Sequence, residues 1–168
     1  IKAVTMLDAF AATAVTALTA QNTEGVFGIL PIAPDFIRRQ MEVVLDDIGA
    51  DAIKTGMLHD AAVIETVAAV LAERAAQVPL VVDPVMVAKG GAPLIEPSAI
   101  DALKRLLVSR AAVLTPNLPE AEILAGCSIE SRAAMEETAR ALLDLGCRAV
   151  LLKGGHLLSV QEEWVVSV

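Results

Sequence analysis

The chain has few aromatic residues: among its 168 residues are three phenylalanines, one tryptophan and no tyrosine. Because 55% of the residues are nevertheless hydrophobic, a core must be built from alanine, valine, leucine and isoleucine. With 20% of residues charged, the composition excludes an intrinsically disordered chain. Small aliphatic residues are typical of parallel sheets covered by helices on both faces. We therefore expect one α/β domain, a size that 168 residues fit.

Positive charge is also scarce, with 13 basic against 21 acidic residues and a net charge of 13 − 21 = −8. This charge repels phosphates, and we expect no nucleic-acid partner. The longest run without charge, residues 9–23, is too short to span a bilayer, so we expect no membrane partner. Cys127 and Cys147 have neither CxxC nor metal-ligand spacing. They are typical of core residues in a reducing compartment, which favours a cytoplasmic enzyme.

Apolar residues recur in patterns that predict alternating strands and helices. The predicted strands cover residues 10–20, 52–54, 79–82, 111–114 and 149–152, with an extended segment over 25–31. The predicted helices cover residues 1–7, 33–48, 60–76, 98–107, 118–124 and 132–145. Asp60 is expected to cap its helix, and Ser98 to form a capping box with Asp101. Strands that alternate with helices predict βαβ units and a mostly parallel sheet.

Polar residues follow the predicted strands, and ligands of open α/β sheets bind beyond the carboxyl ends of the strands. Two carboxylates, a lysine and two amides are expected to meet at this edge: Asp83, Glu120, Lys153, Gln21 and Asn117. Such a set fits phosphoryl transfer, which depends on positioning and on neutralising charge. No P-loop, HExxH or GxSxG motif occurs, and no GxGxxG follows the first strand.

Four of these residues, and Met57, also have a purely structural interpretation. Asp83 precedes a proline and is equally typical of a turn. Asn117 and Glu120 have the spacing of a helix capping box, which needs no ligand. Lys153 is equally consistent with an ordinary strand end, and Met57 with core packing. Spacing alone leaves both interpretations open.

Five segments occur here in the order in which one enzyme family carries them: residues 16–23, 54–58, 83–94, 115–122 and 153–156. Together they resemble the hydroxymethylpyrimidine/phosphomethylpyrimidine kinases of thiamine biosynthesis, in the ribokinase-like superfamily. The resemblance implies a three-layer α/β/α sandwich with a mostly parallel central sheet. It further implies ATP- and Mg²⁺-dependent phosphorylation of 4-amino-5-hydroxymethyl-2-methylpyrimidine and then of its monophosphate. Members of this family are typically homodimers.

The resemblance also implies individual roles. The pyrimidine ring would contact Gln21, Met57 and Val85. Asp83 and Glu120 would hold Mg²⁺, directly or through water, and both supply the oxygen ligands that this ion prefers. Asn117 and Lys153 would lie near the ATP phosphates, and Lys89 in a loop that closes over the site.

Two segments that the resemblance leads us to expect are not in the chain. A glycine-rich start with a substrate-contacting acid should precede Ile1, and a D-T-x-G-T-G-C-type motif should follow residues 153–156. The second motif supplies an anion hole and the catalytic base, so no catalytic residue is assigned here. Residues 158–164 resemble the helix that follows this second motif in the family. We therefore expect a single kinase domain over residues 1–168, incomplete at its N-terminus and interrupted between Leu157 and Leu158. Two alternatives stay open: a pyridoxal or pyridoxine kinase, and a catalytically silent pyrimidine-binding or dimerisation module.

Overall fold

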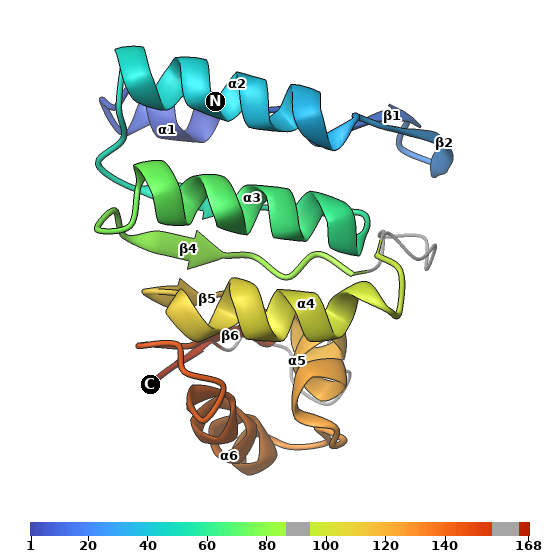
Figure 1. Cartoon of the computed structure of the whole chain (residues 1–168). Helices are drawn as coiled ribbons and strands as arrows, with labels where there is room; N and C mark the ends of the chain where they lie inside the picture. The colour runs from blue at the N-terminus through green and yellow to red at the C-terminus, as the bar shows by residue number, and fades with distance from the viewer. Residues whose placement is uncertain (87–94, 156–164) are drawn as a thin grey trace.

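The computed structural model describes residues 1–86, 95–155 and 165–168. Its helices are α1 (Lys2–Met6), α2 (Pro34–Asp47), α3 (Ala61–Arg74), α4 (Ala99–Leu106), η1 (Val108–Arg110), α5 (Leu118–Ala125) and α6 (Arg132–Leu143). Its strands are β1 (Ala17–Gln21), β2 (Val26–Pro31), β3 (Ile53–Thr55), β4 (Leu80–Val82), β5 (Val113–Leu114), β6 (Leu151–Lys153) and β7 (Val165–Ser167). Figure 1 shows helices and strands alternating down the molecule. Among the described residues, no helix combines the length and apolarity needed to cross a bilayer.

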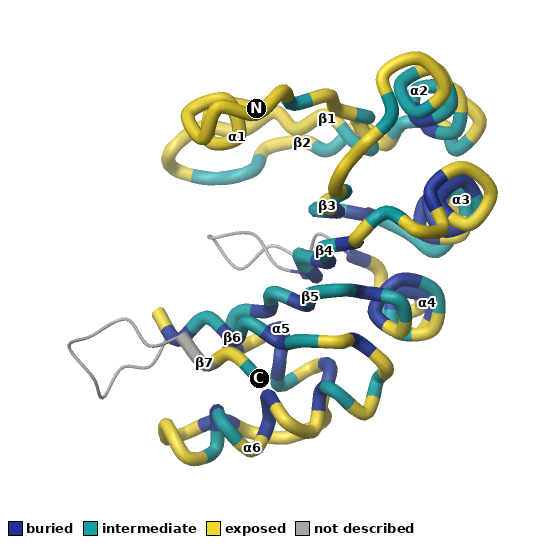
Figure 2. Tube along the Cα trace, turned by 90° about the vertical axis from the view of Figure 1, so that its left-hand side faces the viewer, coloured by how far each residue is buried: buried dark blue, intermediate teal, exposed yellow. Residues whose placement is uncertain are grey.

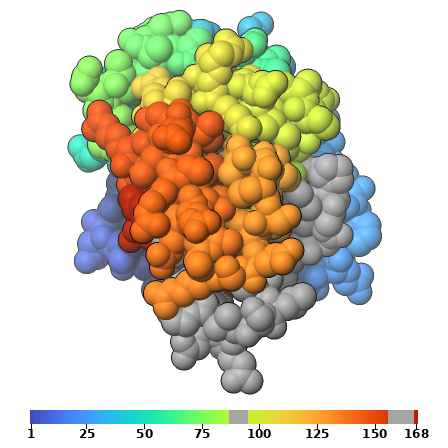
Figure 3. Space-filling model, turned by 90° about the horizontal axis from the view of Figure 1, so that it is seen from below, coloured from blue at the N-terminus to red at the C-terminus, as the bar shows by residue number. Residues whose placement is uncertain are grey.

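The centre of the fold is a parallel sheet in the order β3-β4-β5. Two parallel bridges, Leu114 to Val150 and Asn117 to Lys153, join β5 to the β6 segment. Figure 2 shows α2, α3 and α4 stacked along one side of β3, β4 and β5, while α5 and α6 pack beside β6. Seen from below, residues of α5 and α6 form much of that end of the molecule (Figure 3). The predicted α/β class is confirmed.

The core is aliphatic, as the composition predicts. None of the buried residues in the described part of the chain is aromatic. Its largest fully buried side chains include Ile37, Ile64, Leu71, Leu107 and Leu114. These residues come from α2, α3 and β5 and from the residue that follows α4, so the sheet and one helical layer share a single core.

The N-terminal region differs from the prediction. A buried strand over residues 10–20 is wrong: β1 is confined to Ala17–Gln21, four of its five residues are exposed, and it pairs antiparallel with β2. The side chain of Asn22 accepts hydrogen bonds from the backbone N–H groups of Glu24 and Gly25 and so closes the turn of this hairpin. The predicted helix over residues 1–7 is present as α1, but none of its residues is buried. A run of small apolar residues fits a hairpin arm as well as a buried strand, because the two differ only in what covers them.

One predicted helix cap is present in the structure and another is not. The Asp60 side chain accepts from Val63 N–H at 2.8 Å and caps α3 as predicted. Ser98 precedes α4 but makes no cap bond, so its predicted capping box is wrong: its backbone is helical, whereas a capping residue is extended. The antiparallel pairing of β7 with β6 was not predicted. Residues 158–164, like Lys89, lie outside the described residues.

Candidate functional site

Asp83 lies directly after β4, and its carboxylate contacts two lysines. The Nζ atom of Lys54 lies 2.9 Å from Oδ2, and the Nζ atom of Lys153 lies 3.1 Å from Oδ1. Thr55 pairs with Val82 in the parallel register, which brings Lys54 beside Asp83 from the neighbouring strand. The Asp83 side chain is 20% exposed, against 58% for Lys54 and 43% for Lys153. The carboxyl edge of the sheet thus holds one sheltered carboxylate between two ammonium groups that reach solvent.

The lysines also change the ionisation of Asp83. Partial burial alone would raise the pKa of this carboxyl. Hydrogen bonds from Lys54 and Lys153, together with their charges, outweigh burial and hold the pKa of Asp83 below its ordinary value. Asp83 is therefore an anion at neutral pH, as a ligand for a cation has to be.

Asn117 and Glu120 form the capping box whose spacing the sequence shows. The Asn117 side chain accepts from Glu120 N–H at 2.9 Å, and the Glu120 carboxylate accepts from Asn117 N–H at 2.8 Å. Glu120 is 3% exposed, and burial raises its pKa. Backbone bonds and the charge of Lys153 oppose that rise, whereas the charge of Asp83 adds to it. The capping-box interpretation of Asn117 and Glu120 is confirmed, and the charge of Asp83 acts on the Glu120 carboxyl.

Lys153 connects this helix start to the sheet. Its backbone N–H donates to the carbonyl of Pro116 at 2.9 Å, and the residue bridges to Asn117 in parallel register. Lys153 therefore joins Asp83, Asn117 and Glu120 in one neighbourhood at the carboxyl edge of the sheet.

The donor set of this neighbourhood suits Mg²⁺. Within residues 1–86, 95–155 and 165–168, no group of three or more acidic, histidine or cysteine side chains could hold a metal ion. Mg²⁺ does not need such a cage, because it is commonly bound by one or two carboxylates together with water and substrate phosphates. Asp83 and Glu120 fit that mode of binding, and the charge of Asp83 acts on Glu120.

The three residues predicted to contact the pyrimidine lie on three different segments of the chain. Val85 follows Asp83 closely, and its N–H donates to the Asp83 carbonyl at 2.9 Å. Met57 follows β3, and its carbonyl accepts from the Thr16 hydroxyl at 2.7 Å. Gln21, in contrast, is exposed at the end of β1 in the hairpin. Met57 and Val85 thus share the edge that carries Asp83, and Gln21 lies on a separate element.

The described chain matches the phosphomethylpyrimidine kinase family along its whole length, residues 1–168. The chain belongs to this family. It is 45% identical to the hydroxymethylpyrimidine/phosphomethylpyrimidine kinase of Haemophilus influenzae over 170 residues, which is 99% of this chain and 63% of that protein. Other curated relatives are likewise longer, and the chain spans less than two thirds of their length.

Solved structures of this kinase family and of pyridoxal kinases share the fold. The crystal structure of phosphomethylpyrimidine kinase from Clostridium difficile 630 has a TM-score of 0.88 and 36% identity, covering 98% of this chain and 71% of that one. A Staphylococcus aureus pyridoxal kinase in complex with AMP-PCP and pyridoxal has a TM-score of 0.86 and 32% identity, covering 99% and 60%. The ribokinase-like fold that the sequence implies is confirmed.

Lys54 is the site residue to which the sequence assigned no role. It lies in the segment 54–58 that carries part of the resemblance to the phosphomethylpyrimidine kinases. The available signal was its place in the strand before the one that ends at Asp83, because adjacent parallel strands put such residues side by side.

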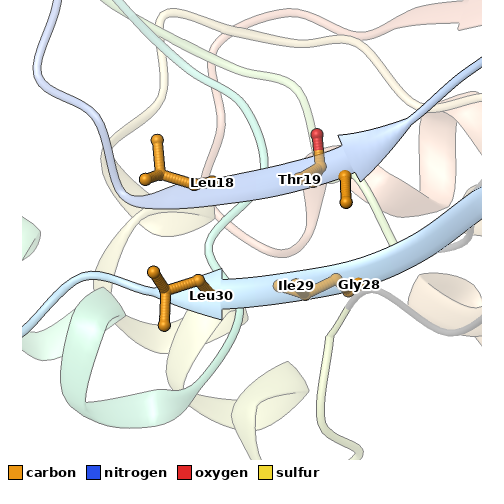
Figure 4. Close-up of a pocket in the computed structure, with 6 residues that line it drawn as sticks. Leu18, Thr19, Gly28, Ile29 and Leu30 are labelled. Atoms are coloured by element: carbon orange, nitrogen blue, oxygen red, sulfur yellow. The ribbon is translucent and has the colours of Figure 1, made fainter.

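Surface hollows lie elsewhere on the described residues. A shallow hollow of about 400 Å³ lies on the hairpin, where Leu18 and Leu30 are register partners on neighbouring strands (Figure 4). A second, of about 250 Å³, lies near the amino ends of β4 and β5 and includes Leu80, Ala112 and Arg148. Neither hollow is lined by Asp83 or Lys153, so the site is identified by its charged groups rather than by a cavity.

Proposed function

We propose that the full-length protein transfers the γ-phosphoryl group of ATP to the hydroxymethyl group of 4-amino-5-hydroxymethyl-2-methylpyrimidine and then to the resulting monophosphate. The observation that carries this proposal is the meeting of Asp83 with Lys153 at the carboxyl edge of the sheet, beside the start of α5. Phosphoryl transfer needs positioned charges of both signs and little covalent chemistry from the protein. The names of the relatives support the choice of substrate.

Within this proposal, Asp83 and Glu120 hold Mg²⁺, which when bound neutralises charge on the phosphates. Asn117 and Lys153 face the nucleotide phosphates, and the AMP-PCP complex of the related pyridoxal kinase supports the use of ATP. Gln21, Met57 and Val85 contact the pyrimidine ring, where an amide side chain both donates to and accepts from an aminopyrimidine edge. No residue of the described part is proposed as the general base.

The extent of the kinase domain is a further part of this proposal. We propose that residues 1–168 are the larger part of one kinase domain, which in the natural protein begins before Ile1 and has further residues between Leu157 and Leu158. The longer relatives support a longer domain, since the chain spans 63% of the Haemophilus protein. The proposed residues between Leu157 and Leu158 rest on the resemblance alone. An intact mass of 17.5 kDa for the natural protein would contradict it.

An ADP-release assay on the full-length protein tests the reaction. Hydroxymethylpyrimidine, its monophosphate and pyridoxal are offered separately, each with ATP and Mg²⁺. Turnover of both pyrimidines, well above that of pyridoxal, is the expected result. Preferred turnover of pyridoxal would identify a pyridoxal kinase, the alternative that the Staphylococcus aureus structures favour. Binding of the pyrimidine without any turnover would instead identify a silent binding module.

We also propose that the protein works as a homodimer in the cytoplasm. The hairpin presents the large apolar side chains of Leu18, Phe27 and Leu30 to solvent, and patches of this kind mark interaction surfaces. Cys127 and Cys147 are both free thiols, which is the usual state in a reducing compartment. Cys147 is buried as predicted from the sequence, whereas Cys127 is exposed.

A further inference from the structure

The two lysines reach Asp83 from opposite sides of the proposed site. Lys54 belongs to β3, the strand that leads to Met57, where the pyrimidine is proposed to bind. Lys153 belongs to β6 and bridges to Asn117, where the nucleotide phosphates are proposed to lie. Each ammonium group takes a different carboxylate oxygen, so Asp83 stands between a substrate side and a nucleotide side.

Stability does not explain the second lysine. An ion pair whose lysine is 58% exposed contributes little to folding, because water screens the charges and the side chain loses freedom. Lys153 already pairs with the Asp83 carboxylate, so Lys54 is not needed to neutralise it. An exposed ammonium group at the proposed point of transfer can bind an anion.

We propose that Lys54 binds the phosphate of the phosphorylated substrate in the second of the two proposed reactions, and this inference rests on the proposed function. In that reaction an oxygen of the substrate phosphate forms a bond to the γ-phosphorus of ATP. The bond from that phosphorus to the bridging oxygen breaks, and ADP carries the electron pair away. Two anionic groups must approach each other, and Lys54 reduces their repulsion on the acceptor side.

The acceptor of the first proposed reaction carries no negative charge. It is an uncharged hydroxyl group, so a cation on the acceptor side has no phosphate to bind. Lys54 therefore distinguishes the two substrates by charge: it matters to the monophosphate and much less to the alcohol. Lys153, on the nucleotide side, serves both reactions equally.

Substitution of Lys54 in the full-length protein tests the proposal. Lys54→Gln should lower kcat/KM and binding affinity for the monophosphate by about 10- to 100-fold, the value of a hydrogen bond to a charged group. It should change kcat/KM for the alcohol by less than about threefold, and Lys54→Arg should restore most of the monophosphate activity. Lys104→Gln, which removes the same charge from the last turn of α4, is the matched control and should alter neither.

One result of this substitution would overturn the proposal. An equal loss of kcat/KM for both substrates in Lys54→Gln would show that the lysine only holds Asp83 in place. Turnover of the alcohol by the unchanged protein tests the proposed function separately, so the two proposals fail in distinguishable ways.

A measurement on the unchanged protein covers the case in which the variant does not fold or no turnover is seen. Lys54 is exposed enough for acylation by an amine-specific reagent, followed by peptide mass spectrometry. The monophosphate should slow acylation of Lys54 several-fold, whereas the alcohol at a saturating concentration should slow it much less. Equal protection by both ligands, or none by the monophosphate, would contradict the assignment.

Discussion

The Nζ atom of Lys153 lies 3.1 Å from Oδ1 of Asp83, although the two residues are 70 positions apart in the chain. Asp83 follows β4 and Lys153 ends β6, and β5 lies between these two strands. The pair therefore spans the strand that leads to Asn117 and Glu120. The proposed metal ligands and phosphate-binding residues are held by three successive strands of one sheet.

Asp83→Asn should separate catalysis from folding. The change removes a negative charge that the proposed Mg²⁺ site needs, and it leaves Lys54 and Lys153 without their anion. Mg²⁺-dependent turnover should fall on the order of 100-fold, whereas calorimetric binding of the pyrimidine should stay within about twofold, because the Met57 region is unchanged. Asp101→Asn on α4 is the control, since it removes an exposed carboxylate that is not part of the candidate site. Equal loss of turnover and pyrimidine binding would instead assign Asp83 a folding role.

Asn117 should contribute to both stability and nucleotide binding. Asn117→Ala removes the cap of α5 and should lower the free energy of unfolding by about 1 kcal/mol. Ser131→Ala removes the equivalent cap of α6, where the Ser131 hydroxyl accepts from Ala134 N–H at 3.2 Å, and should have a similar cost. Only Asn117→Ala should weaken ATP binding, as measured by calorimetry. Equal ATP affinity in both variants would leave Asn117 a purely structural cap.

Glu120→Gln tests the metal role of a buried acid. Burial raises the pKa of Glu120, so the folded state loses stability as pH rises from the ordinary pKa of glutamate through the raised one. The amide keeps the acceptor for Asn117 N–H and avoids the buried charge. At pH 7 the variant should therefore unfold at the same or a higher denaturant concentration, while its Mg²⁺ requirement for half-maximal turnover rises about tenfold or more. A normal Mg²⁺ requirement would limit Glu120 to the cap.

Ionised Asp83 should stabilise the folded protein, so this contribution to the free energy of unfolding is lost in acid. The pH dependence is the reverse of that expected from Glu120. Its pKa is lowered in the folded state, so its stabilising contribution is complete above the unfolded value, near pH 4, and is lost as pH falls through the folded value. The free energy of unfolding should thus decline more steeply below about pH 4 in the unchanged protein than in Asp83→Asn. Urea titrations between pH 2.5 and 7 measure both slopes. Parallel slopes would show that the lysines do not stabilise the ionised Asp83.

Local features of the fold were predictable because local chemistry determines them. The cap at Asp60 and the capping box of Asn117 and Glu120 follow from side chains that bond to backbone groups three residues away. Short strands around residues 53, 81 and 151 follow from apolar runs between helices. The position of Asp83 at the carboxyl edge then follows from the rule for parallel sheets.

Features that depend on distant partners were not predictable from periodicity. The contact of Lys54 with Asp83 depends on the register of β3 against β4, which no local pattern specifies. The hairpin differs from a buried strand only in what covers it, so Leu18 has the same sequence signature in either case. Serine is a common capping residue, and only the helical backbone of Ser98 shows that it does not cap α4.

Replacing Thr55, which precedes Met57 at the end of β3, should stabilise the fold. Its side chain is 6% exposed, and among the described residues its hydroxyl has no hydrogen-bond partner. An unpaired buried hydroxyl is unfavourable, so Thr55→Val should raise the free energy of unfolding by about 1 kcal/mol. Thr16→Val is the contrasting control: the Thr16 hydroxyl donates to the Met57 carbonyl at 2.7 Å, and its loss should cost about 1 kcal/mol. Destabilisation by Thr55→Val would show that a bound water or ligand pairs with the hydroxyl.

The hairpin should control the oligomeric state. Leu18 and Leu30 pair across β1 and β2 and are 51% and 62% exposed, and Phe27 on β2 is 71% exposed. A second copy that covers this surface would remove these side chains from water, at about 25 cal/mol for each Å² of apolar area. Leu30→Glu would place a charge in that interface, and its effect should be a shift from dimer to monomer at micromolar concentration in sedimentation-velocity measurements. Ile123→Glu, at an exposed apolar position on α5, is the control and should remain dimeric. A monomeric unchanged protein would contradict the proposed dimer, and a dimeric Leu30→Glu variant would move its interface away from the hairpin.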